Sequence, residues 1–227
     1  NGTMDEVMIW NRALSSEEIA ELYDSYGLPV AHWSFDEGEG NIAHDESGNG
    51  NDGTLENGPV WVDGIDGNAL HFDGIDDYVV VDDDDSLNVG TGNFSFSVWI
   101  NVELNKGTDD VGQIYRKGQS GGSSRNSELQ LRDYDGNVYV TGYAGTQPII
   151  SNGTVEVGKW YHIVFLREGS QIKLYINGNY DNSLTISSFN LSNSEPLYIG
   201  YDPNHPDDYF NGTMDEVMIW NRALSSE

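Results

Sequence analysis

The chain has 227 residues, of which 37% are hydrophobic and 11% aromatic, and this apolar content excludes disorder along its whole length. Aspartate and glutamate number 38 against 10 lysine and arginine residues, and the formal net charge of -28 excludes nucleic acids and anionic membrane surfaces as partners, because they carry the same sign. No apolar run is long enough to insert into a membrane, and the absence of cysteine excludes disulfide bonds.

The first segment of the chain is repeated later in the sequence. Residues 1–17 recur without a change as residues 211–227, which is a period of 210 residues. A fold tolerates many substitutions, so an unbroken run of identities indicates a tandem array of near-identical repeats. We expect residues 1–26 to be the last strand and helix of a preceding identical unit, and residues 28–227 to form one nearly complete domain.

The segment after this first copy carries the signals of a short helix. Ser15 is a good N-cap, and Glu18 stands three residues further on as its capping-box partner. A helix is predicted over residues 16–23, and Gly27 supplies the left-handed residue that ends it. This helix would connect one unit to the next.

All later elements are predicted as strands. Residues 93–102 form a long strand with Phe94, Phe96, Val98 and Ile100 on one face. Further short strands, separated by turn signals, are predicted at residues 30–35, 60–62, 69–72, 78–81, 112–116, 128–133, 138–143, 160–167, 171–177, 183–187, 196–200 and 214–220. This spacing predicts an all-β fold, a two-sheet antiparallel jelly-roll sandwich with one short connecting helix.

Five motifs along residues 28–227 resemble one known family. They are AHWSFDEGEGNIAHDESGNGNDGTL, PVWVDGIDGNALHFDGIDDYVVV, FSFSVWI, GKWYHIVFLREGSQIKLYINGN and GTMDEVMIWNRALSSE. In this order they resemble the concanavalin-A-like, laminin-G-like jelly-roll domains of bacterial and archaeal surface proteins. The resemblance implies two curved antiparallel sheets and an extracellular or cell-surface location. It does not imply one activity, because such domains serve as carbohydrate binders, adhesion modules and spacers.

The same resemblance implies a structural Ca²⁺ site. Members of the superfamily hold calcium between an acidic residue on the first strand, the loop after it and an aspartate on the last strand, and Asp36 and Asp215 stand in these two strand positions. Asp45 and Asn51, on the glycine-bearing loop, offer further oxygen ligands of the kind that calcium prefers. The alternative is that Asp45 and Asn51 make Asx-turns and that Asp215 faces solvent.

No enzymatic activity is expected. Glycosidases need two carboxylates opposed across a cleft, whereas Asp215 and Glu216 are adjacent and would point to opposite faces of a regular strand. The histidines show no metalloprotease spacing, and His32 and His162 are interpreted as ordinary sheet residues. The acidic run at residues 82–85 is interpreted as a charged turn that opposes aggregation, with a second cation site as the alternative.

Carbohydrate binding is the alternative function. Sugar rings stack on exposed aromatic faces while their hydroxyls bind polar neighbours. The candidates for this role are Tyr134, Tyr139, Tyr143 and Tyr201, with Arg132 and Asn137. Trp33, Trp99, Trp160 and Trp220 are interpreted as core residues that face inward.

The main functional prediction is a non-catalytic extracellular structural or adhesive module, stabilised by calcium. Neighbouring copies of the same repeat are its expected partners, and they could build a stalk, sheath or filament. Asp5, Val7, Ile9 and Trp10 carry the same strand pattern as the last strand. We expect them to pair with a neighbouring unit, because a lone apolar strand is an aggregation hazard.

Overall fold

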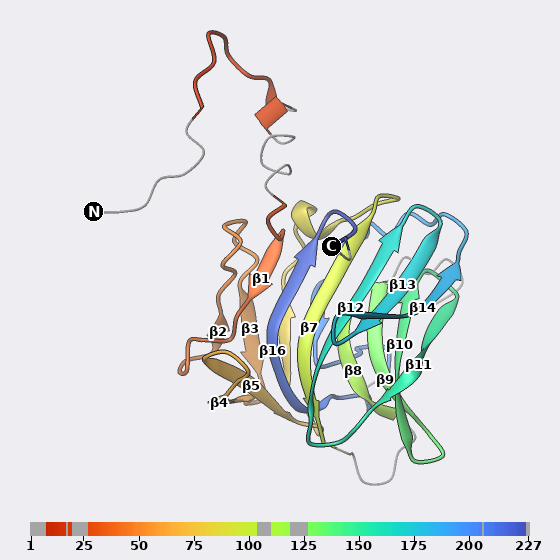
Figure 1. The fold of residues 1–227 in the computed structure, drawn as a ribbon. Helices are drawn as coiled ribbons and strands as arrows, with labels where there is room; N and C mark the ends of the chain where they lie inside the picture. Colours follow the sequence, from red (N-terminus) through yellow and green to blue (C-terminus); the bar gives the residue numbers. More distant parts are fainter. Residues whose placement is uncertain are drawn as a thin grey trace.

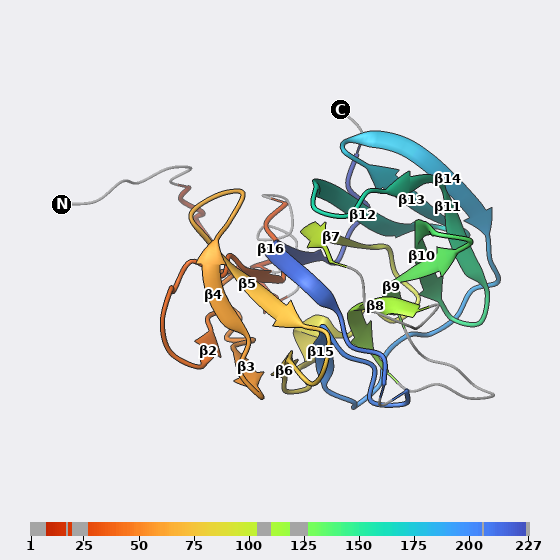
Figure 2. The same ribbon diagram turned by 90° about the horizontal axis from the view of Figure 1, so that it is seen from below.

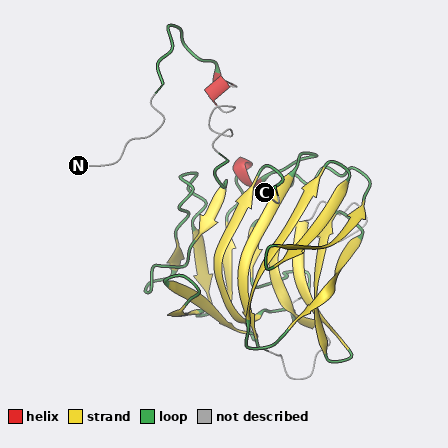
Figure 3. Cartoon of the chain, viewed as in Figure 1, coloured by secondary structure: helices red, strands yellow, loops and turns green. Residues whose placement is uncertain are grey.

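The computed structural model describes residues 8–16, 18–19, 27–103, 110–118, 127–205 and 207–225, without the side chains of residues 110 and 111. Strands dominate this part of the chain, and helix is confined to a turn near Ile19 and to the 3-10 helix η1 (Asp85–Leu87), as Figure 3 shows. Two antiparallel sheets form two layers in Figure 2, so the predicted all-β jelly-roll sandwich is confirmed. No helix among the described residues is long and apolar enough to cross a membrane.

Sheet A places the last strand of the domain near its middle. Its strand order is β14-β13-β12-β7-β16-β5-β4, and β1 pairs with β16 beside this path (Figure 1). The strands are β1 (Ala31–Trp33), β4 (Val60–Asp63), β5 (Asn68–Asp73), β7 (Phe94–Val102), β12 (Trp160–Glu168), β13 (Gln171–Ile176), β14 (Asn179–Thr185) and β16 (Asn211–Trp220).

Sheet B has the strand order β11-β10-β9-β8-β15-β6-β3-β2. Its strands are β2 (Ile42–Ala43), β3 (Gly53–Glu56), β6 (Tyr78–Val81), β8 (Asp110–Lys117), β9 (Ser127–Tyr134), β10 (Asn137–Ala144), β11 (Pro148–Val155) and β15 (Leu197–Ile199). The chain crosses between the sheets after β1, β3, β5, β6, β7, β11, β14 and β15, as a jelly roll requires. The acidic run at residues 82–85 leads into η1, whose N-cap Asp84 accepts a hydrogen bond from Ser86 N at 2.8 Å.

The hydrophobic core fills the space between the two sheets. Phe94, Phe96, Val98 and Ile100 of β7 are at most 2% exposed and face this core, as the period-two pattern predicts. Phe96 stacks on Tyr115 of β8, with ring centroids 3.8 Å apart. Burial of such side chains contributes about 1.5–3 kcal/mol each, so the sandwich needs no disulfide.

The tryptophans divide between the core and the outer face of sheet A. Trp33 is fully buried in the core, and its indole donates to Asn51 O at 2.8 Å. The prediction that Trp99, Trp160 and Trp220 also face inward is wrong. Trp99 pairs with His162, Trp160 with Asn101 and Trp220 with Ser95, all on the face of β7 that points away from Phe96.

The predicted start of the helix is confirmed. Glu18 N donates to Ser15 Oγ at 3.2 Å, and Ser15 N donates to Glu18 Oε2 at 2.9 Å, which together form a capping box. Ile19 N donates to Ser15 O at 3.0 Å and closes the first turn. Gly27 has the expected positive φ of 66°, while residues 20–26 lie outside the described part.

The two copies of the repeated segment have different surroundings. The second copy supplies β16, in which Ile219 is 6% exposed. In the first copy, Asp5 and Val7 lie outside the described residues, whereas Ile9 and Trp10 lie outside both sheets and are 94% and 41% exposed. Residues 8–16 lie away from the sandwich in Figure 1. Its pairing with a neighbouring unit, and the boundary between units, stay predictions.

Candidate functional site

A β-bulge in β16 shapes the outer face of sheet A. Asp215 pairs with Trp99 and Met218 pairs with Ser97, so β16 holds one residue more than β7 over this stretch. Glu216 adopts a left-handed backbone with φ of 51°, which costs about 1–3 kcal/mol in a residue with a side chain. Such bulges re-aim side chains and are frequent beside binding sites.

A depression with a volume of about 550 Å³ lies on this outer face. We call it the Trp99 depression, and its lining residues are Ile65, Asp66, Ser97, Trp99, His162, Glu216 and Met218. The Trp99 and His162 rings lie 5.0 Å apart, centroid to centroid. Ser97 Oγ and His162 Nε2 share a hydrogen bond of 2.7 Å. Burial lowers the pKa of His162, which favours its neutral form.

Two adjacent carboxylates of β16 lie at the Trp99 depression, where Glu216 lines it and Asp215 is buried beside it. Glu216 Oε2 lies 2.8 Å from His32 Nε2, and His32 Nδ1 lies 3.7 Å from Glu46 Oε2. Asp215 is fully buried, and its Oδ2 accepts hydrogen bonds from Ile65 N at 2.8 Å and from Asp66 N at 3.2 Å. Because Glu216 is the extra residue of the bulge, it also lines the outer face. The expectation that Asp215 and Glu216 point to opposite faces is therefore wrong, and so is the alternative that Asp215 faces solvent.

The turn between β4 and β5 is held from both sides by predicted calcium ligands. Asp215 binds the N–H groups of Ile65 and Asp66, and Asp36 Oδ1 accepts from Asn68 N at 2.7 Å. A side chain at Gly64 or Gly67 would collide with these carboxylates, since a Cβ would lie 2.5 Å from Asp215 Oδ2 and closer still to Asp36 Oδ1. Glycine is therefore required on both sides of the turn.

Asp45 and Asn51 form a second, separate group in the loop between β2 and β3. Asp45 Oδ1 accepts from His32 N and Ser47 N, and Asp45 Oδ2 accepts from Asn51 N and Ser47 Oγ, at 2.8–2.9 Å. Burial raises the pKa of the Asp45 carboxyl, but these hydrogen bonds outweigh it and leave the pKa below its usual value. The contacts include the Asx-turn that was the alternative to calcium. A cation bound by Asp45 would have to displace some of these donors.

The fit to calcium differs among the four predicted ligands. Asp215 Oδ1 is buried and has no hydrogen-bond partner, which leaves it able to accept a cation. Burial raises the pKa of Asp215 to about 6, although its backbone partners lower it. Among the described residues, the carboxylates that lie close enough together to hold one cation are Asp73, Asp76 and Asp77. None of the predicted calcium ligands belongs to this group. Calcium at Asp36, Asp45, Asn51 and Asp215 stays a prediction.

The outer face of sheet B carries the predicted sugar-binding tyrosines in two groups. The Tyr134 and Tyr139 rings lie 5.8 Å apart on β9 and β10, and Arg132 pairs with Tyr139. Tyr143 and Asn137 belong to the same hairpin. Tyr201 lies elsewhere, in a cluster with Tyr78, Tyr198 and Tyr209. The structure thus brings five of the six predicted residues to one hairpin and separates Tyr201 from them.

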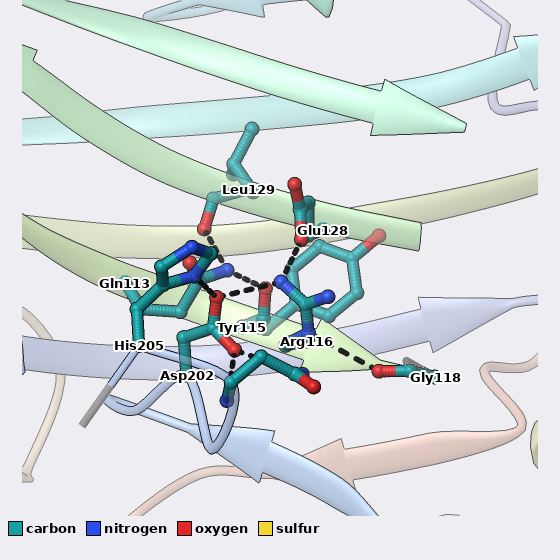
Figure 4. A network of polar contacts seen from close by, with 9 residues as sticks. Gln113, Tyr115, Arg116, Gly118, Glu128, Leu129, Asp202 and His205 are labelled. Atoms are coloured by element: carbon teal, nitrogen blue, oxygen red, sulfur yellow. Dashed lines mark hydrogen bonds and ion pairs between the residues drawn. The ribbon is translucent and has the colours of Figure 1, made fainter. Parts of the chain in front are cut away.

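A buried charged network fixes the loop that carries Tyr201. Arg116 Nη1 contacts Glu128 Oε2 and, at 2.7 Å, Asp202 Oδ2, and all three side chains are less than 10% exposed (Figure 4). Asp202 Oδ2 also lies 2.8 Å from His205 Nδ1. The Tyr201 ring stacks on Tyr209 with centroids 4.5 Å apart. The network ties the connection between β15 and β16 to β8 and β9.

The sandwich and its polar, aromatic outer faces define a lectin-like jelly-roll domain. The family model described as the concanavalin A-like lectin/glucanases superfamily, Laminin_G_3, matches residues 73–227. The chain belongs to this family. No curated protein matches it.

Solved structures share the fold at low sequence identity. The binding domain of Paraclostridial Mosquitocidal Protein 1 is 20% identical, with a TM-score of 0.69 over 88% of this chain and 50% of that one. Domain 4 of AbnA, an extracellular arabinanase from Geobacillus stearothermophilus solved with arabinotriose, is 22% identical, with a TM-score of 0.63 over 87% and 94%. A Trypanosoma rangeli sialidase is 20% identical, with a TM-score of 0.65 over 88% and 32%. The chain thus spans half of the mosquitocidal binding domain and about a third of the sialidase.

Sequence reasoning missed Trp99, His162 and Glu216 as site residues. The sequence did contain a signal for Trp99. It lies an odd number of positions from Phe96 and Val98 in the same strand, so its side chain belongs on the opposite face. Nothing local signals the bulge that brings Glu216 to the outer face. The site therefore depends on a pairing irregularity between distant strands.

Proposed function

We propose that the chain is a non-catalytic, extracellular adhesive module that binds carbohydrate in the Trp99 depression. The observation that carries this proposal is an indole face beside a hydroxyl, an imidazole and a carboxylate in one depression, from Trp99, Ser97, His162 and Glu216. Its volume of about 550 Å³ lies in the range of small-ligand sites, roughly 300–1,000 Å³. The presence of arabinotriose in a structure of similar fold supports a sugar as ligand.

Each group has a separate task in sugar recognition. The flat indole of Trp99 offers its face to the C–H groups of a pyranose or furanose ring. Glu216 accepts hydrogen bonds from ring hydroxyls, and His32, at 2.8 Å, fixes its orientation. The hydrogen bond between Ser97 and His162 leaves further donor and acceptor capacity for a second hydroxyl.

Burial of Asp215 supports a binding role without catalysis. Its pKa is raised to about 6, as a general acid would require. However, the side chain is fully buried, and its Oδ2 already accepts two backbone N–H groups of the β4–β5 turn. It cannot reach a glycosidic oxygen without opening that turn. Besides Glu216, the depression is lined by the carboxylate of Asp66, and product formation from a bound glycan tests whether these two residues act in catalysis.

Trp99→Ala is expected to weaken glycan binding by about 2 kcal/mol, which is roughly thirtyfold in affinity, because the stacking platform is lost. A glycan array probed with the full chain identifies the ligand, and calorimetric titration then gives Kd for each variant. Because Trp99 lies on the outer face, the variant should keep its fold, which circular dichroism checks.

Tyr139→Ala is the matched control on the outer face of sheet B. It should leave Kd unchanged if the sugar binds on sheet A. Loss of binding in Tyr139→Ala with retention in Trp99→Ala would place the ligand on sheet B and overturn the assignment. Product formation from any bound glycan, abolished by one carboxylate substitution, would overturn the absence of catalysis.

A calcium-stabilised structural repeat is the second candidate function. The identity of residues 1–17 with residues 211–227 favours it, because near-identical units suit stalks or filaments. The unpartnered Asp215 Oδ1 supports a cation beside the β4–β5 turn. In this role the partners are neighbouring copies of the same unit.

Calcium is expected to raise the melting temperature by roughly 5–10 °C at a free concentration of 100 Kd, since ligand binding to the native state contributes about 2.7 kcal/mol there. Scanning calorimetry with calcium, with magnesium and with chelator measures the shift. Magnesium is the control, because it demands tighter octahedral geometry. Identical melting curves in calcium and chelator would remove calcium from the proposal.

A further inference from the structure

An apolar groove lies next to the Trp99 depression on the outer face of sheet A. We call it the Leu224 groove, and its lining residues are His162, Val164, Leu166, Tyr175, Gly178, Leu224 and Ser225. Its volume is about 200 Å³. Val164 and Leu166 belong to β12 but point away from the core, so this part of the outer face is apolar. Val164 and Leu166 are 9% and 2% exposed and Tyr175 is half-buried, so a small apolar space is left open to a side chain from outside.

The segment that follows β16 already covers one end of this groove. Ser95 Oγ donates to Arg222 O at 2.9 Å and accepts from Leu224 N at 2.9 Å, so the chain folds back over sheet A. Arg222 also donates to Gly27 O at 3.0 Å. These contacts place Ser225, next to Leu224, in the lining of the groove.

The first copy of the repeated segment indicates what can follow Ser225. In the 210-residue period, Ser225 corresponds to Ser15, which caps a helix through Glu18. The sequence continues with Ile19, Leu22, Tyr23 and Tyr26, spaced so that a helix would place them on one face. Ile19 is 56% exposed, so this apolar face begins without a cover.

We propose that the Leu224 groove of one copy of the chain is the docking site for the helix that begins at Ser15 of the next copy. The two copies would be joined in tandem, so that residues 211–227 of the first are also residues 1–17 of the second. The N-cap of such a helix coincides with Ser225, and its apolar face then meets Val164, Leu166 and Tyr175. Lys173, which pairs with Leu166 across β12 and β13 and contacts Glu168, lies beside this contact, and the helix carries Glu21. The proposal rests on the tandem arrangement but not on glycan binding.

The test completes the helix on the full chain by adding the sequence of residues 18–27 after Glu227. Docking should raise the melting temperature by about 5 °C relative to the unextended chain, because the added apolar face is removed from water. It should also slow hydrogen exchange in β12 and β13. The matched control carries aspartate in place of the added counterparts of Ile19 and Leu22, and it should melt like the unextended chain.

A groove variant tests the other half of the contact. In the extended chain, Tyr175→Ala should remove most of the gain, whereas Tyr134→Ala on sheet B should retain it. Equal melting of the extended chain and its aspartate control would overturn the proposal, and so would a full gain in Tyr175→Ala. These measurements contain no sugar, so their failure leaves the Trp99 result standing, and the reverse also holds.

Discussion

Replacing Arg116 by methionine is expected to lower the free energy of unfolding by about 3–5 kcal/mol, because it leaves buried carboxylates without their cation. Glu128 and Asp202 both contact the Arg116 guanidinium, and their side chains are 9% and 3% exposed. Neither carboxylate can turn to solvent without moving β9 or the loop after β15. Guanidinium-induced unfolding, followed by tryptophan fluorescence, measures the loss.

A triple variant separates the charge from the packing. Adding Glu128→Gln and Asp202→Asn to Arg116→Met should recover part of the loss, because the buried carboxylates then carry no charge. Lys159→Met is the surface control, since its ion pair with Glu156 is solvent-exposed. An Arg116→Met protein as stable as the wild type would show that the network contributes nothing to folding.

The free energy of unfolding should fall as the pH rises from about 4 to about 6, because Asp215 titrates in this range. Burial raises its pKa in the folded state to about 6, whereas an unfolded aspartate has a pKa of roughly 3.9. Between these values the folded state keeps a proton that the unfolded state releases, so stability falls as pH rises. The stabilisation is fully present below the lower pKa and is lost by about pH 6. The expected loss is about 3 kcal/mol.

Asp215→Asn should remove this dependence, because the amide does not titrate and can still accept from the turn. Unfolding of both proteins is measured from pH 4 to pH 7 in chelator, since bound calcium would favour the ionised carboxylate. The difference between the two proteins isolates Asp215 from other carboxylates. A difference that does not change with pH would refute the shifted titration.

Local patterns predicted most elements of this fold but missed the strands β2, β3 and β11. The alternation of Phe94, Phe96, Val98 and Ile100 identified the core face of β7, and the spacing of Ser15 and Glu18 identified the capping box. Both depend on residues a few positions apart, whose relative geometry is fixed by the strand or helix period. The family resemblance implied the same sandwich architecture that the strand spacing predicted.

The candidate site was not predictable in the same way. Asp215 meets Ile65 across 150 positions of sequence, and no period relates them. The bulge at Glu216 arises from the pairing of β16 with β7, and the pairing of β7 with β12 places Trp99 beside His162. Asp45 was read as a possible metal ligand, yet its oxygens accept from four N–H and O–H groups. Such contacts depend on how strands and loops meet.

The antiparallel pairing of β1 with β16 has a mechanical consequence for a domain pulled at its ends. Ala31 pairs with Ile219, and Val30 N donates to Ile219 O at 2.7 Å, so the start of β1 lies beside the end of β16 (Figure 1). Tension applied at Gly27 and Ser225 would therefore act at one end of this strand pair. It would unzip the hydrogen bonds one after another instead of shearing them together. Under load, the domain would yield first at β1, while the rest of sheet A stays paired.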